Sequence, residues 1–307
     1  MRRFLLFLVL VIGLNAWNDA EAIDFRDGPP FRPTVPVTWA ASSPIPQTLP
    51  VYQVLTTRLP QSLISNAMTI GSFKSINLVK SKEKGVMEFR DKPGDNEWTR
   101  FLKVSDAGWV KYYDKSASQV PAHGVPTFEE AEKQALRYFV LLGGDTNQLA
   151  PKPWPHNEST FETHNPSDGR LMAKGVSRRW VCLFRQIEGI PITGDSLSVD
   201  FGCDAKPIML EMHWRPLKFI KRVEIPTKGE ILAIVKSGKA WIQMFPPPPE
   251  DITSAKSYKI KNFVALYAQE SSEGENLMKP YGSLLVEADM SGRPVNAVIN
   301  FQIVTEK

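Results

Sequence analysis

FRQIEGIPITGDSLSV, residues 184–199, is the stretch that decides the fold interpretation of this chain. Gly189 and Gly194 permit a tight reversal, because glycine adopts turn conformations at little steric cost. Pro191 fixes φ in the segment between them. Apolar and polar residues then alternate over 197–201, as in a strand with one buried face. The stretch therefore predicts an antiparallel hairpin, with Asp195 and Ser196 as turn residues.

A helix is predicted before this hairpin. Thr127 is a favourable N-cap, and Glu130 three residues later completes the pattern of a capping box. Apolar residues recur near helical spacing over 129–142, and two glycines follow. Similar patterns predict helices over 59–70 and 228–235. Strand-like segments follow each helix, so the order of elements suggests three successive units.

The hairpin and its preceding helix, over residues 126–217, resemble the PepSY domain pattern. In that pattern a strand ends in x-Gly-Val-Pro-Val-x-Gly and a second, alternating strand follows. Gly189, Pro191 and Gly194 fill the turn positions, whereas the turn at 202–206 replaces the family's usual Asp-Gly. The resemblance implies an α+β fold of two or three tandem PepSY/cystatin-like units, each a helix packed on a curled antiparallel sheet. It also implies a non-catalytic protein that binds or inhibits a partner.

The predicted organisation divides the chain into five consecutive parts. They are a signal peptide (1–22), a Pro-rich extended leader (23–50), and α+β units at 51–118, 119–222 and 223–307. Seven prolines between residues 28 and 50 disfavour a helix or an interior strand, so the leader is expected to be polyproline-like.

The first 22 residues have the three regions of a secretory signal peptide in order. Arg2-Arg3 is the basic region, residues 4–14 form the apolar run, and Ala20-Glu21-Ala22 matches a cleavage site. The apolar run is shorter than the roughly 20 residues that cross a bilayer. We therefore expect a secreted or periplasmic protein, with no membrane span in the mature chain.

Composition and motifs argue against several classes of function. The formal net charge is only +4 over 307 residues, and no dense basic stripe is present, so nucleic acid is not expected as a partner. Gly-x-Ser-x-Gly, His-Glu-x-x-His, P-loop and dinucleotide-binding patterns are all missing. The sequence thus predicts no catalytic residue and no cofactor.

A polar loop expected over 147–169 contains the only metal candidates. Imidazole and carboxylate ligands suit zinc and similar cations, although the spacing matches no common zinc motif. The alternative is a plain solvated loop. The four candidates are His156, Glu158, Glu162 and His164.

Cys182 and Cys203 are the only two cysteines. Export permits a disulfide, and the two lie on successive predicted strands. The alternative is a pair of buried free thiols.

Several tryptophans lie in or beside strand patterns. They either pack in cores or form an aromatic patch on an open sheet face that receives a partner. The five are Trp98, Trp109, Trp180, Trp214 and Trp241.

Three functional hypotheses follow. The first is an exported, non-catalytic binding or regulatory protein that contacts another exported protein or peptide, for example a peptidase or an envelope component. The second is a metal-assisted hydrolase that uses the segment from His156 to His164. The third is a structural envelope protein.

Overall fold

The computed structural model is built mainly of β-strands. It describes residues 30–55, 61–73, 77–79, 81, 83–92, 98–243, 254–272 and 275–303. Fifteen strands and three α-helices lie within these residues. Hydrogen-bonded pairing connects the fifteen strands into one mixed sheet. The predicted signal peptide, residues 1–22, lies outside the described residues.

Two compact units make up the chain, and their segments interleave. Unit 1 consists of Met1–Val54, Ile190–Gly194 and Leu217–Lys307, and unit 2 consists of Leu55–Gly189 and Asp195–Pro216.

The expected α+β fold of tandem PepSY/cystatin-like units is wrong. Strand dominates the structure, and the sheet contains parallel as well as antiparallel pairs. The physical reason is long-range pairing: β1 (Val37–Trp39) joins β13 (Tyr258–Ser272) in parallel, across more than 200 residues of sequence. Local periodicity predicts strands but does not specify such partners.

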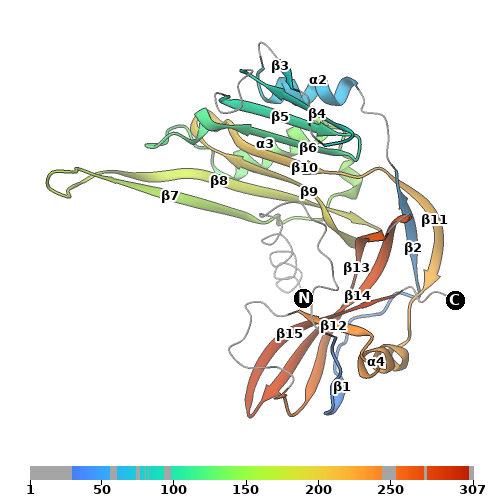
Figure 1. Ribbon diagram of the computed structural model, residues 1–307. Helices are drawn as coiled ribbons and strands as arrows, with labels where there is room; N and C mark the ends of the chain where they lie inside the picture. Colours follow the sequence, from blue (N-terminus) through green and yellow to red (C-terminus); the bar gives the residue numbers. More distant parts are fainter. Residues whose placement is uncertain are drawn as a thin grey trace. The chain divides into compact units, whose positions relative to one another are not determined.

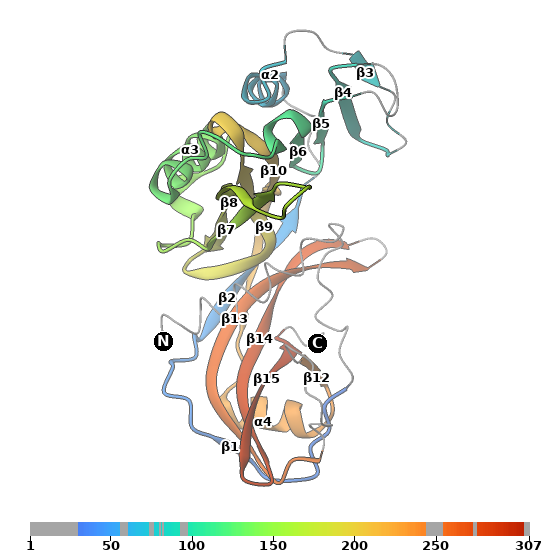
Figure 2. The same ribbon diagram turned by 90° about the vertical axis from the view of Figure 1, so that its left-hand side faces the viewer.

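Unit 1 is organised around two long neighbouring strands, β13 and β14 (Glu275–Met290), which pair along most of their length. Figure 2 shows them curving side by side. β14 also pairs with β15 (Arg293–Gln302), which in turn pairs with β12 (Ala240–Gln243). Nearer the beginning of β14, β2 (Thr48–Val54) pairs with Leu277 and Met278, and β2 also pairs with the edge strand β11 (Leu217–Glu224).

The described part of the Pro-rich segment is packed into unit 1. Phe31 is buried, and its ring meets Tyr258 edge-on with the centroids 4.9 Å apart. Val37 and Leu49 are also buried, in β1 and β2. Pairing with distant strands supplies the hydrogen bonds and the apolar cover that a polyproline-like leader lacks.

Unit 2 contains an antiparallel series of strands in the order β3–β4–β5–β6–β10–β9–β8–β7. Their bounds are β3 Asn77–Val79, β4 Val86–Arg90, β5 Arg100–Ser105, β6 Trp109–Asp114, β7 His156–His164, β8 Leu171–Ile187, β9 Ile190–Phe201 and β10 Pro207–His213. The first five residues of β9 belong to unit 1. Figure 1 shows β7 and β8 continuing as a two-stranded ribbon.

All three predicted helices are confirmed. They are α2 (Gln61–Ile70), α3 (Phe128–Leu141) and α4 (Lys228–Lys236). The capping boxes that begin α3 and α4 are complete, with a threonine side chain accepting from the N3 backbone in each.

One face of the unit 2 sheet, here called the inner face, forms the core with α2 and α3 (Figure 2). Ala131, Ala135 and Phe139 of α3 are fully buried against strand residues such as Leu183 and Val199. Burial of this apolar stripe, more than helix propensity, holds α3 in place.

Candidate binding face

The four metal candidates lie in a strand and not in a loop. His156, Glu158, Glu162 and His164 all belong to β7, which pairs in register with β8. They share one face because each is separated from the next by an even number of residues. A strand advances about 3.4 Å per residue, so the two histidines are about 27 Å apart along β7.

This extended geometry keeps His156 and Glu158 apart from Glu162 and His164 within one chain, although His164 lies 3.6 Å from Glu162. No group of three or more metal-binding side chains occurs among the residues that the structure describes. Instead Glu158 pairs with Arg179 at 3.2 Å, and Glu162 pairs with Lys174 at 2.7 Å. The hydrogen bond from Lys174 lowers the pKa of Glu162.

The two cysteines are buried free thiols. Cys182 lies in β8, whereas Cys203 lies in the short 3-10 turn after β9 and donates to the backbone oxygen of Gln119. They are therefore not directly opposed on neighbouring strands. Burial raises the pKa of Cys182 to about 12, which makes this thiol unreactive near neutral pH.

The hairpin glycines have different roles in the structure. Glu188 and Gly189 both have positive φ and form the two-residue turn between β8 and β9. Pro191 and Gly194 lie inside β9, so the strand begins earlier than the sequence predicted. Gly194, with φ of 79°, is a local irregularity in that strand.

Asp195 is a second correction in this region, because it is a buried strand residue and not a turn residue. Its carboxylate contacts Arg185 at 2.7 Å and also receives a hydrogen bond from Arg215. The Arg185 guanidinium lies 4.8 Å from the ring centroid of Trp214. Burial lowers the pKa of Arg185, and Asp195 opposes that effect. The buried carboxylate of Asp195 is thus compensated by two arginines. We therefore assign this cluster a role in stability and not in binding.

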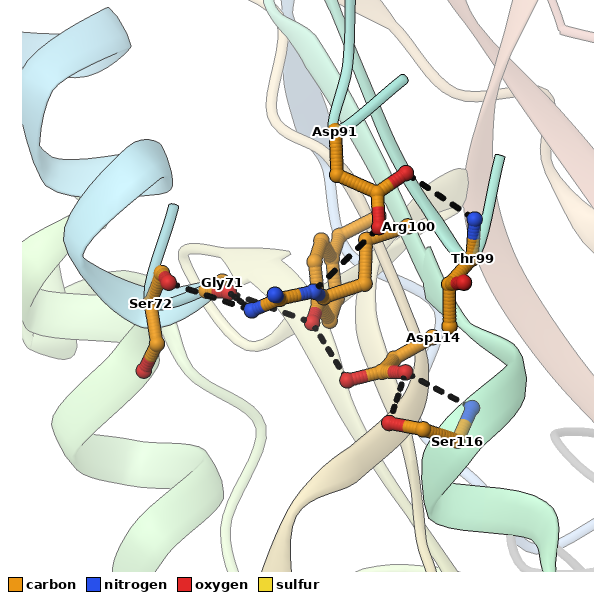
Figure 3. A network of polar contacts seen from close by, with 8 residues as sticks. Gly71, Ser72, Asp91, Thr99, Arg100, Asp114 and Ser116 are labelled. Carbon is orange, nitrogen blue, oxygen red and sulfur yellow. Dashed lines mark hydrogen bonds and ion pairs between the residues drawn. The ribbon is translucent and has the colours of Figure 1, made fainter. Parts of the chain in front are cut away.

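A second polar network fastens α2 to the sheet (Figure 3). Arg100 donates to the backbone oxygens of Gly71 and Ser72, both at 3.1 Å, at the end of α2. Its Nε lies 3.9 Å from Asp91, whose carboxylate accepts from the backbone N–H of Thr99. An arginine suits this position because cations stabilise the carbonyl end of a helix.

Tyr112 and Asp114 extend this network, and Figure 3 labels Asp114 beside Ser116. The Tyr112 hydroxyl donates to Asp114 at 3.2 Å, and Asp114 also accepts from the backbone N–H and the hydroxyl of Ser116. Burial raises the pKa of Tyr112 far above its ordinary value, so this hydroxyl stays protonated. These side chains hold the backbone at the end of α2 and at Ser116 in place, and we assign them no catalytic or binding role.

The opposite side of the unit 2 sheet, here called the outer face, is the strongest candidate for a binding surface. Strand alternation puts the odd-numbered residues of β5 and β6 on it, together with the residues paired with them. The register aligns Phe101 with Tyr113, Tyr113 with Met209, and Met209 with Asp200. A parallel row aligns Lys103, Lys111, Glu211 and Ser198.

Aromatic side chains gather at two places on the outer face. Trp98 meets Phe101 edge-on at 4.8 Å, Phe101 stacks with Tyr113 at 6.0 Å, and the Lys115 ammonium lies 3.7 Å from the Trp98 ring centroid. All three rings are partly exposed. Exposed, rigid aromatic groups of this kind are typical anchors of protein–protein interfaces.

The second aromatic position is the stack of Trp109 on His213, with ring centroids 6.3 Å apart. His213 also contacts Glu211 at 3.1 Å, and Lys111 lies 3.7 Å from the same carboxylate. Farther across the sheet, Trp180 donates through its indole N–H to Ser198. The outer face therefore combines flat aromatic surface with charges already fixed in pairs.

Asp200 is the most deeply buried charged group on the outer face. Its side chain is 3% exposed, and one oxygen contacts Arg178 at 3.1 Å. The other oxygen, Oδ1, has no hydrogen-bond partner among the described residues. Burial raises the pKa of Asp200, and Arg178 opposes that effect.

The comparisons with known proteins give no family. No protein-family model matches the chain, and no curated protein matches it. The PepSY resemblance therefore stays a prediction. Among the described residues, no helix has both the length and the apolar character that crossing a membrane requires.

Trp98, Trp109 and Trp180 of the outer face are among the five tryptophans for which the sequence left core packing or an exposed patch open, and their partners were not predicted. Lys111, Glu211 and His213 come from two strands that are about 100 residues apart in sequence, so only the register shows their proximity. Asp195 could have been recognised, because it has the same parity as Leu197 and Val199 and therefore shares their inner face.

Proposed function

We propose that this chain is an exported, non-catalytic binding protein whose outer face in unit 2 receives another exported protein or peptide. The observation that carries the proposal is the outer face itself, where partly exposed aromatic rings lie among paired charges. Export rests on the signal-peptide pattern at the N-terminus.

The composition of the outer face favours a polypeptide partner. Arg90, Lys103 and Lys111 are balanced there by Glu88 and Glu211. Such alternating charge gives no basic track for a nucleic-acid backbone. It does offer hydrogen-bonding groups beside apolar rings, the combination found in interfaces between proteins.

The metal-assisted hydrolase gains no support from the structure of one chain. Its candidate ligands lie along an extended strand, and their carboxylates pair with neighbouring basic residues. No observation specifically favours the structural envelope protein.

The test is capture of a partner with matched surface variants. The purified wild-type chain is immobilised, proteins from the native exported fraction are recovered, and the affinity of each recovered protein is then measured by calorimetry. Trp109→Ala and Phe101→Ala should each weaken binding by about tenfold or more, since truncating a central interface anchor costs about 2 kcal/mol or more and tenfold corresponds to about 1.4 kcal/mol.

Phe219→Ala is the control, because Phe219 is also aromatic and 53% exposed but lies on β11 in unit 1. It should bind the partner as the wild type does. A partner that binds the two outer-face variants with unchanged affinity would refute the proposed surface.

A further inference from the structure

β7 leaves one strand edge open. Among the described residues it pairs with β8 alone, in the ribbon visible in Figure 1. The two register shifts of this ladder each add a residue to β8, Ser177 and Met172, so β7 itself stays regular. The even-numbered side chains of β7 are all exposed: His156, Glu158, Thr160, Glu162 and His164.

The backbone groups of these same five residues point to the open edge. The Pro155 oxygen accepts from the Cys182 N–H, and the Asn165 N–H donates to the Arg170 oxygen, so odd-numbered positions bond toward β8. Successive residues of a strand direct their N–H and C=O groups to opposite edges. The even-numbered residues therefore offer a row of donors and acceptors to another strand.

The five residues also form a palindrome, His-Glu-Thr-Glu-His, centred on Thr160. If two copies of β7 pair antiparallel with Thr160 opposite Thr160, His156 of one copy faces His164 of the other. Glu158 then faces Glu162 in the same way. Such pairing has two-fold symmetry, so it closes as a dimer and does not propagate.

This arrangement brings His156 and Glu158 of one chain to Glu162 and His164 of the other, and the latter two already lie 3.6 Å apart within one chain. Directly opposed residues in a hydrogen-bonded antiparallel pair have Cα atoms about 5.5 Å apart, and next-but-one residues on a strand are about 7 Å apart. Two imidazoles and two carboxylates thus occupy the corners of a small rectangle on one face. Zinc binds such nitrogen and oxygen ligands at about 2.0–2.2 Å in tetrahedral geometry.

We propose that β7 is a zinc-dependent dimerisation edge, with two equivalent sites per dimer. Each site takes His156 and Glu158 from one chain and Glu162 and His164 from the other. Without a cation, opposed glutamates disfavour the pairing, which protects the open edge. The carboxylates of Glu158 and Glu162 are exposed, so both exchange their pairing with Arg179 and Lys174 for a metal ion.

The decisive experiment measures molar mass and zinc content together. The purified chain is freed of metal with EDTA, titrated with zinc, and analysed by size-exclusion chromatography with light scattering. We expect a monomer without zinc and a dimer with one zinc per chain, reversed by EDTA. Zinc binding without a change in mass, or a dimer that is indifferent to zinc, would overturn the proposal.

Two kinds of variant test the metal ligands and the strand edge independently. His164→Ala should weaken zinc-dependent association by about 100-fold or more, since even outer partners of metal ligands are worth about 10–100-fold. His123→Ala is the matched control, because His123 is 65% exposed but lies outside β7. A dimer of unchanged affinity in His164→Ala would exclude the assigned ligand set.

Thr160→Pro removes an N–H that points to the open edge and leaves the metal ligands and the β7–β8 hydrogen bonds in place. It should abolish the dimer, whereas Thr160→Val, which keeps the N–H, should dimerise as the wild type does. Circular dichroism confirms that each variant is folded. Zinc-dependent dimerisation of a folded Thr160→Pro would show that β7 is not the pairing edge.

Discussion

The two faces of the unit 2 sheet differ in the kind of side chain that they carry and in how far those side chains are buried. The inner face is apolar and covered by α2 and α3, and its charged groups lie in two networks, around Asp195 and around Arg100. The outer face carries aromatic rings and ion pairs whose members are mostly half-exposed. The same strands supply both faces, so the alternation of side chains separates stability from recognition. The inner face should dominate stability, and the outer face should dominate binding.

The largest expected effect comes from removing an inner-face ring. Phe139→Ala should lower the free energy of unfolding by about 4 kcal/mol, because Phe139 is fully buried and its loss leaves a cavity. Phe101→Ala, an equal truncation on the outer face, should cost about 1 kcal/mol. Urea unfolding of both variants measures the difference. Equal losses would contradict the proposed division between the faces.

A somewhat smaller effect is expected from the charged cluster of the inner face. Asp195→Asn removes the carboxylate that compensates Arg185 and Arg215 and should cost about 3 kcal/mol, because a buried charge then lacks its counter-ion. Glu211→Gln is the matched change on the outer face. Its ion pairs are partly exposed, so it should cost less than about 1 kcal/mol. A larger loss for Glu211→Gln in urea unfolding would reverse the comparison.

The smallest effect concerns pH and the outer face. Burial raises the pKa of Asp200 above its ordinary value of 3.8, so the folded protein binds this proton more tightly than the unfolded chain does. Protonated Asp200 therefore stabilises the fold fully at pH values below 3.8. This stabilisation is lost as the pH rises through the raised pKa of Asp200. Asp200→Asn lacks this titration.

The free energy of unfolding of wild type minus that of Asp200→Asn should accordingly fall as the pH rises above the ordinary value of 3.8. Unfolding of both proteins at a series of pH values measures it. A difference that rises with pH would mean that the ion pair with Arg178 outweighs burial.

Local features of the fold were predictable from sequence because their causes are local. The capping box at Thr127 begins α3 where expected, and Gly189 lies in the turn of the central hairpin. Capping and turn geometry depend on residues within a few positions of each other. For the five tryptophans in or beside strand patterns, the sequence left core packing and an exposed patch open as alternatives.

Long-range features were not predictable in this way. The polar segment from His156 to His164 was expected to be a loop, and it became a strand only because β8 supplies its partners. β1 and β2 arise from a Pro-rich segment for the same reason.

Sequence by itself thus determined the three helices, their caps and the hairpin turn. Tertiary structure alone decided which strands pair, that Arg185 and Arg215 meet at Asp195, and that Lys111, Glu211 and His213 meet on one face. The physical reason is the distance in sequence between the residues that each feature requires. Caps and turns form within one short segment, whereas strand pairing and charge burial depend on contacts between residues far apart in the chain.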